Sequence, residues 1–160
     1  MKPTIRECEP SGDRDQLRRC IVELQEFERT LESALPAAID MADLYFDLLL
    51  KRCSGTSGRI LVAEIGQTII GLTAVLARVL PDDPDEEQTP YAYISDLVVL
   101  PDYRGRGVGH ALLEQAEAYA RSAGATILRI NVLAKNEDAA RLYGNFGFTD
   151  YRIQLIKRLP

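Results

Sequence analysis

One continuous stretch, DLVVLPDYRGRGVGHALLEQAEAYARSAG at residues 96–124, joins a strand-like run, a glycine-rich loop and a helix-like run. The loop, RGRGVG at residues 104–109, places three glycines and two arginines at the start of the predicted helix. A helix N-terminus offers unpaired N–H groups and the positive end of its dipole, and glycine lets the backbone approach an anion closely. The stretch therefore predicts a site for a phosphate or pyrophosphate group.

Two other phosphate-binding motifs do not fit this loop. A Walker A loop requires Gly-Lys followed by Ser or Thr, and the loop has no such triplet. The dinucleotide fingerprint G-x-G-x-x-G fails at His110, and residues 127–131, where its acidic residue should stand, contain no acid. From the loop alone, the alternative is a glycine-rich connection that binds nothing.

The periodicity of the rest of the chain predicts an α/β protein with a mixed (α+β) sheet, folded as a single domain over residues 1–160. Strands are expected at residues 4–8, 59–65, 68–79, 91–100, 126–133 and 149–159, and helices at 15–35, 37–53, 107–123 and 136–147. Gly66 and Gln67 predict a tight hairpin turn. The helix at 107–123 makes a crossover, so the strands on either side of it should lie parallel.

The composition excludes several classes of function. The net charge of −5 argues against general attraction to nucleic acid or to an anionic membrane surface. No apolar run is long enough for a membrane span, and the N-terminus lacks a signal peptide. The three cysteines follow no metal or redox spacing, and the single histidine argues against a His-rich metal site. We therefore expect a cytoplasmic protein with reduced thiols, no bound metal, and no nucleic-acid or membrane partner.

The pattern Arg104-x-x-Gly107-x-Gly109 resembles the R/Q-x-x-G-x-G/A signature of the acetyl-CoA-dependent GNAT N-acetyltransferases. The flanking segments LVVLPDYRG and NEDAARLYGNFGF stand where that family has its other acetyl-CoA elements, and the order of elements matches over nearly the whole chain. The resemblance implies the GNAT acyl-CoA N-acyltransferase fold, a mixed six- to seven-stranded sheet flanked by about four helices. It also implies acetyl-CoA as the cosubstrate.

The resemblance further implies which residues hold the cofactor. The pyrophosphate would rest on backbone amides of the loop formed by Arg104, Gly105, Arg106, Gly107, Val108, Gly109 and His110. The pantetheine arm would pair with the edge of the strand at Leu97, Val98 and Val99, left free because the next strand splays away. Asn136 would contact the cofactor, and the acidic residues after it also make it a good helix N-cap.

The implied reaction is attack of a neutral amine on the acetyl-CoA thioester in a ternary complex. Deprotonating an alkylammonium at pH 7 costs roughly 4–5 kcal/mol, so the site must supply a base or lower the amine pKa. The resemblance makes Tyr143 the acid that protonates the departing thiolate; the alternative is a core aromatic. A backbone N–H near Val99 would stabilise the oxyanion.

The base is less well defined, because Ser95-Asp96 replaces the Glu-Asp pair of many relatives, and Tyr93 stands where other members have glutamate. Simple alternation places Ser95 and Asp96 on opposite faces of the strand, unless a bulge intervenes. Asp96 is then either the base or a buried structural carboxylate. Alternatively, a water held by Ser95, Tyr93 or a backbone carbonyl relays the proton.

Only the distribution of acidic residues in the sequence gives information on the amine that accepts the acetyl group. Acids occur on the first helix (Glu23, Glu26 and Glu28) and in the loop at residues 80–90 (Asp82, Asp83, Asp85, Glu86 and Glu87). They are either solvated surface or an attraction for a cationic amine such as a polyamine, an amino sugar or a lysine side chain. The alternative function is a catalytically silent acetyl-CoA-binding regulatory module. Dimers are common in the family, so a homodimer is also expected, with a contribution from the final strand.

Overall fold

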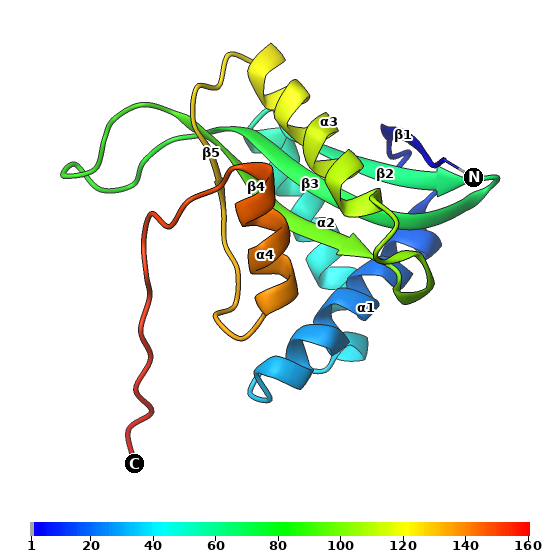
Figure 1. Ribbon diagram of the computed structural model, residues 1–160, viewed down its shortest axis with the longest axis horizontal. Helices are drawn as coiled ribbons and strands as arrows, with labels where there is room; N and C mark the ends of the chain where they lie inside the picture. The colour runs from blue at the N-terminus through cyan, green and yellow to red at the C-terminus, as the bar shows by residue number, and fades with distance from the viewer. Residues whose placement is uncertain (1) are drawn as a thin grey trace.

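A computed structural model describes residues 2–160 and contains one five-stranded sheet in the order β1-β2-β3-β4-β5 (Figure 1). The strands are β1 (Thr4–Glu7), β2 (Arg59–Ile65), β3 (Thr68–Val79), β4 (Tyr91–Val99) and β5 (Leu128–Ile130). The first three pairs are antiparallel, and β4 and β5 are parallel. The crossover prediction and the hairpin at Gly66 are therefore confirmed, and Gly66 has a φ of +63°.

Helices cover both faces of the sheet (Figure 1). The helices are α1 (Arg14–Leu31), α2 (Ala38–Gly55), α3 (Val108–Ser122) and α4 (Glu137–Phe146). One core cluster joins α1 and α2 to the sheet through Leu17, Phe46 and Val98, and a second joins α3 and α4 to it through Leu113 and Tyr143. The mixed α/β architecture predicted from the sequence is present.

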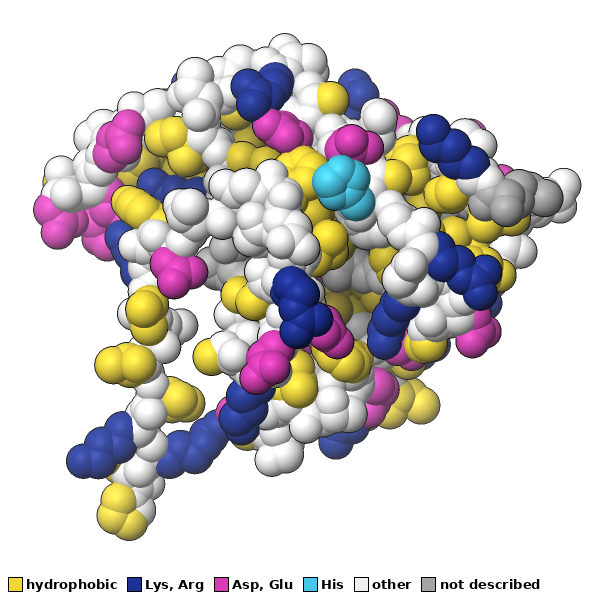
Figure 2. Space-filling view, viewed as in Figure 1, with side chains coloured by type: hydrophobic (Ala, Val, Ile, Leu, Met, Phe, Trp, Pro, Cys, Tyr) yellow, Lys and Arg dark blue, Asp and Glu magenta, His cyan; other side chains and the backbone are white. Residues whose placement is uncertain are grey.

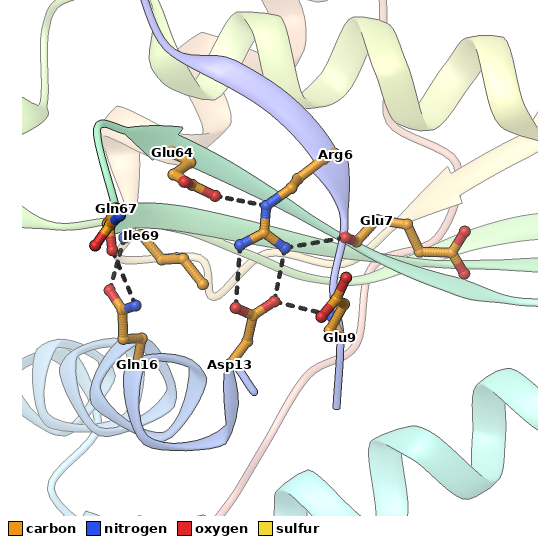
Figure 3. A network of polar contacts seen from close by, with 8 residues as sticks. All are labelled: Arg6, Glu7, Glu9, Asp13, Gln16, Glu64, Gln67 and Ile69. Atoms are coloured by element: carbon orange, nitrogen blue, oxygen red, sulfur yellow. Dashed lines mark hydrogen bonds and ion pairs between the residues drawn. The ribbon is translucent and has the colours of Figure 1, made fainter. Parts of the chain in front are cut away.

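A polar network fixes the start of α1 against the sheet (Figure 3). The guanidinium of Arg6 on β1 donates to both carboxylate oxygens of Asp13, at 2.7 and 3.0 Å, and also binds Glu64 on β2. Arg6 holds the pKa of Asp13 below its usual value. Gln16 donates to the carbonyl of Gln67 and accepts from the amide of Ile69, which attaches α1 to the β2–β3 hairpin. The network thus determines where the rest of α1 lies.

Two predicted elements are several residues shorter in the structure, and the bounds of most others differ by one or two residues. The first helix ends at Leu31, not at residue 35, because Glu32 has extended backbone angles and Pro36 follows shortly after. The strand predicted at 126–133 is shorter, since β5 covers only Leu128–Ile130.

The strand predicted at residues 149–159 is wrong: within the described chain, residues 149–160 form no regular secondary structure (Figure 1). The sheet consequently has five strands where six to seven were expected. Alternating side chains at Tyr151, Ile153 and Leu155 are exposed, so the period-two pattern is real but has no neighbouring strand to pair with. A homodimer that uses this segment stays a prediction.

Candidate functional site

A cavity of about 560 Å³ opens where α1, β4, the start of α3, β5 and α4 meet. It is lined by nearly all of the predicted site residues: Ser95, Asp96, Leu97, Val98, Val99, Arg104, Gly105, Gly107, Val108, Gly109, His110, Asn136 and Tyr143.

No described helix of residues 2–160 is both long and apolar enough to cross a membrane. The same residues contain no group of three or more His, Cys, Asp or Glu side chains that could hold a metal ion.

The cavity exists because β4 and β5 separate. Their parallel pairing ends at Ile94 opposite Ile130, while β4 continues to Val99. The amide of Leu100 bonds to the carbonyl of Ile70 on the β3 side. Since amides alternate in direction along a strand, the N–H groups of Leu97 and Val99 point to the open side. The predicted splaying is thus present, and it leaves backbone donors facing the cavity.

A β-bulge at Ser95 reverses the predicted alternation of side chains. Ala74 pairs with Asp96, but the next β3 residue, Val75, pairs with Ile94, which leaves Ser95 as the extra residue. Tyr93 therefore packs on the α1–α2 side of the sheet with Asp96, and not on the face opposite to Asp96. The bulge brings Ser95 and Asp96 together at the cavity, where simple alternation separates them.

Asp96 is a buried carboxylate, 7% exposed, that two hydroxyl groups hold in place. Tyr45 on α2 donates to it at 2.7 Å, and Ser95 donates at 2.6 Å. Burial raises the pKa of Asp96, and the two hydrogen bonds oppose this shift only in part. Its backbone carbonyl also accepts from Thr73 at 2.9 Å. The arrangement fits a structural carboxylate better than one that is free to receive an amine.

The glycine loop leads directly into α3. Gly105 and Gly107 have φ values of +71° and +80°, in the left-handed region that favours glycine. The first amide bonded within the helix is that of Ala111, to the carbonyl of Gly107. The amides of Val108, Gly109 and His110 therefore lie in the unpaired first turn, at the positive end of the helix dipole. Such a turn suits an anion.

Gly109 also lets α4 approach α3 closely. A Cβ at this position would lie 3.2 Å from the Leu142 side chain and 3.8 Å from that of Val99. The absence of a side chain here keeps the loop, the end of β4 and α4 in one compact wall.

The two arginines of the loop have different surroundings. Arg104 donates to the carbonyl of Val99 and to Glu23 on α1, both at 2.9 Å, so its charge is largely occupied by the protein itself. Arg106 does not line the main cavity; it lines a smaller hollow of about 350 Å³ beside Lys2. Neither arginine side chain therefore offers free positive charge inside this cavity.

His110 presents backbone, more than its ring, to the cavity. Its exposed ring lies edge-on to Phe146, with centroids 5.3 Å apart, and its Nε2 is 3.5 Å from Glu114. Figure 2 shows this side chain in cyan on the viewed surface. The geometry favours the prediction that the amide of His110 faces a ligand.

Helix α4 lines the cavity next to the start of α3. Asn136 is its N-cap, and its side chain accepts from the amide of Ala139 at 3.2 Å, as predicted. Tyr143 is 9% exposed and packs edge-on against Phe148 while also lining the cavity. Burial, with smaller contributions from Glu28, Asp96 and Tyr93, raises the pKa of Tyr143 to about 12. The phenol therefore stays protonated at neutral pH and can serve as a proton donor.

Helix α1 closes the cavity with Leu24, Phe27 and Glu28. Glu28 is half-buried, and burial followed by the charge of Asp96 raises its pKa. The sequence indicated Glu28 only as one of several acids that could attract a cationic amine, since only the fold brings α1 next to β4. The acidic residues of the loop at 80–90 are absent from the cavity lining.

Comparison with known proteins assigns the chain to a family. The acetyltransferase (GNAT) family model matches residues 22–148. This match covers well over half of the sequence, and the chain therefore belongs to the GNAT acetyltransferase family.

Curated relatives carry N-acetyltransferase names. An uncharacterised N-acetyltransferase of Methanocaldococcus jannaschii is 29% identical over 120 residues, which are 72% of this chain and 50% of that protein. The aminoalkylphosphonate N-acetyltransferase of Salmonella typhimurium is 39% identical over 66 residues, 41% of this chain and 43% of that protein. The thialysine N-epsilon-acetyltransferase of Mus musculus is 34% identical over 58 residues, 36% of this chain and 34% of that protein. The chain thus spans half or less of the length of these relatives.

Solved structures share the fold over almost the full chain. A mutant of the BH1408 protein of Bacillus halodurans has a TM-score of 0.85 at 21% identity, covering 98% of this chain and 99% of that one. The aminoglycoside N-acetyltransferase AAC(6')-Iy in complex with CoA has a TM-score of 0.70 at 14% identity, covering 98% and 99%. At these identities the likeness shows the fold alone.

Proposed function

We propose that this protein is an acetyl-CoA-dependent N-acetyltransferase that transfers the acetyl group directly to a primary amine bound beside the thioester. The observation that carries this proposal is the open edge of β4, which lies between an anion-binding helix start and a buried tyrosine. A linear ligand fits this site if its anionic end binds at the start of α3 and its amide-bearing arm pairs with the open edge of β4. Acetyl-CoA has this shape, and the family membership supports it.

On this proposal the pyrophosphate lies against the amides of Val108, Gly109 and His110, at the start of α3. The pantetheine arm pairs with the outward N–H groups of Leu97 and Val99 as an added strand would. The cavity residues thus account for acetyl-CoA as cosubstrate without a metal ion.

The acetyl transfer makes one bond and breaks one. The neutral amine nitrogen attacks the thioester carbonyl carbon, and the amide of Val99 donates to the developing oxyanion, an interaction worth about 10²–10³ in rate. The C–S bond then breaks, and Tyr143 donates its proton to the departing thiolate. Tyr143 suits this role because its phenol remains protonated in the buried site.

The acceptor class follows from what the cavity offers. Aminoalkylphosphonate, thialysine and aminoglycoside occur in the names of the matched proteins, and each name implies an amino group. The acceptor wall of this protein contains a carboxylate, Glu28, and apolar side chains, so a cationic alkylamine or a lysine side chain fits it best. A cytoplasmic location stays a prediction.

The direct test supplies acetyl-CoA with a panel of primary amines and measures release of the CoA thiol and the mass of the product. We expect at least one cationic amine to gain the mass of one acetyl group. Tight binding of acetyl-CoA without turnover of any amine would instead support the silent regulatory module. A protein that binds no acetyl-CoA would contradict both functions.

A further inference from the structure

Glu28 differs from the other glutamates at its end of α1 in having no basic partner. Glu23 pairs with Arg104, Glu26 pairs with Arg29 and accepts from the amide of Ala38, and Glu32, just past the helix, pairs with Arg158. Within residues 2–160, the carboxylate of Glu28 has neither an ion pair nor a hydrogen bond, although it is half-buried. Partial burial makes an ionised carboxylate without a partner less favourable than one fully in water, and a cationic ligand would offset this cost.

Glu28 on α1 lines the same cavity as Tyr143 on α4. Its charge raises the pKa of Tyr143 on α4, and the charge of Asp96 on β4 raises that of Glu28, so the three groups lie within electrostatic reach of one another. On α2, Tyr45 donates to Asp96, and the charge of Arg52 acts to lower the pKa of Asp96. Glu28, Tyr143 and residues 95–99 of β4 thus line one and the same cavity.

The other arginine and carboxylate side chains that line the cavity already have partners within the protein. The guanidinium of Arg104 is held by Glu23 and by the carbonyl of Val99, and that of Arg141 pairs with Asp138, so neither arginine of the cavity lining pairs with Glu28. Asp96 already accepts from two hydroxyl groups and is almost fully buried, so it offers little to an incoming ammonium. Three carboxylates line the cavity, and within the described residues Glu28 is the one that accepts no hydrogen bond, since Asp138 accepts from Arg141 at 3.2 Å.

We propose that Glu28 binds the ammonium group of the acceptor and removes its proton before attack on the thioester. This inference rests on the proposed acetyl transfer and adds the acceptor site to it. The acceptor is a primary alkylammonium whose carbon chain contacts Leu24 and Phe27, which line the same wall. Asp96 is a positioning residue that holds Tyr45 and Ser95.

The proton path balances with these groups alone. The ammonium gives one proton to the Glu28 carboxylate, and the neutral nitrogen forms the new N–C bond. As the C–S bond breaks, Tyr143 protonates the thiolate, and its phenolate takes the second proton from the amide nitrogen as the amide forms. Glu28 later returns its proton to solvent. The sum is one ammonium and one acetyl-CoA giving one acetamide, one CoA thiol and one proton.

The kinetic test compares Glu28→Gln with Glu26→Gln, using 1,4-diaminobutane as the acceptor. Glu26 lies on the same helix, but its carboxylate binds Arg29 and Ala38, and glutamine keeps an acceptor for that amide. General bases contribute about 10²–10⁴ in rate, so Glu28→Gln should lower kcat/KM for the amine by at least about 100-fold. The KM for acetyl-CoA should stay within twofold in both variants, and Glu26→Gln should retain turnover.

The pH profile separates a base from a merely structural residue. In the wild-type protein, kcat/KM should rise with pH through the raised pKa of Glu28, because the base must be deprotonated. In the Glu28→Gln variant this rise of kcat/KM should vanish, and activity should recover only at the higher pH at which the amine itself loses its proton. A Glu28→Gln protein with wild-type kcat/KM and an unchanged profile would overturn the inference. An equal loss of acetyl-CoA affinity would do the same.

A binding measurement keeps this inference separate from the proposed function. Calorimetry on the CoA complex should show that 1,4-diaminobutane binds to the wild-type and Glu26→Gln proteins and at least tenfold more weakly to Glu28→Gln, with 1-butanol binding to none. Glu28-dependent binding without turnover would support the ammonium site and contradict the acetyl transfer. Turnover that is indifferent to Glu28 would support the transfer and contradict the ammonium site.

Discussion

The two walls of the cavity are built in different ways. The donor wall, residues 97–110, is one continuous stretch that offers backbone N–H groups from the end of β4 and the start of α3. The acceptor wall combines side chains that lie far apart in the sequence, Glu28 on α1 with Tyr143 on α4. Backbone groups bind any ligand of the right shape and charge, whereas side chains can change without changing the fold. On the proposed function, changes in the acceptor wall would alter specificity while the donor wall kept the same cosubstrate.

We expect the largest effect on activity from Tyr143→Phe, which removes one hydroxyl from the acceptor wall. Without a proton donor for the thiolate, we expect kcat to fall by about 10²–10⁴. The affinity for acetyl-CoA, measured by calorimetry, should remain within a fewfold, because the donor wall is untouched. Phe146→Leu, a nearby change on the same helix, serves as a control for packing. A Tyr143→Phe protein with wild-type kcat would refute the role of the phenol.

The donor wall is tested by Gly107→Val, which places a β-branched residue at a φ of +80°. Such strain costs of order 1–3 kcal/mol, and it would be relieved by moving the amides that should hold the pyrophosphate. We expect acetyl-CoA affinity to fall by roughly 10–100-fold, with a smaller change in the KM for the amine. Gly144→Ala is the control, since a Cβ there meets nothing within 4 Å. Equal weakening of both ligands would show that the walls are not independent.

The position of α1 is tested by Asp13→Asn, which breaks the pair with Arg6 (Figure 3). Charged hydrogen bonds of this kind contribute about 1.5–3 kcal/mol, and the loss should loosen the acceptor wall first. We expect a lower melting temperature and a several-fold higher KM for the amine, with acetyl-CoA affinity retained. Because the pKa of Asp13 is lowered by folding, its contribution is present above the ordinary Asp pKa and is lost as pH falls through the lower folded value. The stability difference between wild type and variant should therefore shrink in acid.

The smallest effect should come from Glu23→Gln, at the junction of the two walls. Glu23 pairs with Arg104 near the surface, and such pairs contribute about 0–1 kcal/mol. We expect no more than about a fivefold change in the KM of either ligand, weaker still at high salt. A loss of 100-fold in acetyl-CoA affinity would show that Arg104 must be held in place for the loop to bind.

The sequence was sufficient for the parts of the site that depend on local pattern. The glycine loop, the N-cap at Asn136 and the crossover that makes β4 and β5 parallel each have a signal within a few neighbouring residues. The bulge at Ser95 has no such signal, because one extra residue leaves the alternating composition unchanged. Glu28 and its lack of a partner depend on contacts between α1 and β4, which periodicity does not report. The absent strand at 149–159 shows the same limit, since a strand requires a neighbour as well as a pattern.

The separation of β4 from β5 also has a thermodynamic consequence. Outward N–H groups at the centre of a sheet are satisfied only by solvent until a ligand pairs with them, and the native state is therefore linked to the concentration of that ligand. At a hundred times the dissociation constant, a ligand that binds only the folded state adds about 2.7 kcal/mol to its stability. For a chain of this size that corresponds to a rise of roughly 5–10 °C in the midpoint of thermal unfolding. If acetyl-CoA pairs with this edge as proposed, the melting temperature of this protein should rise with the acetyl-CoA concentration.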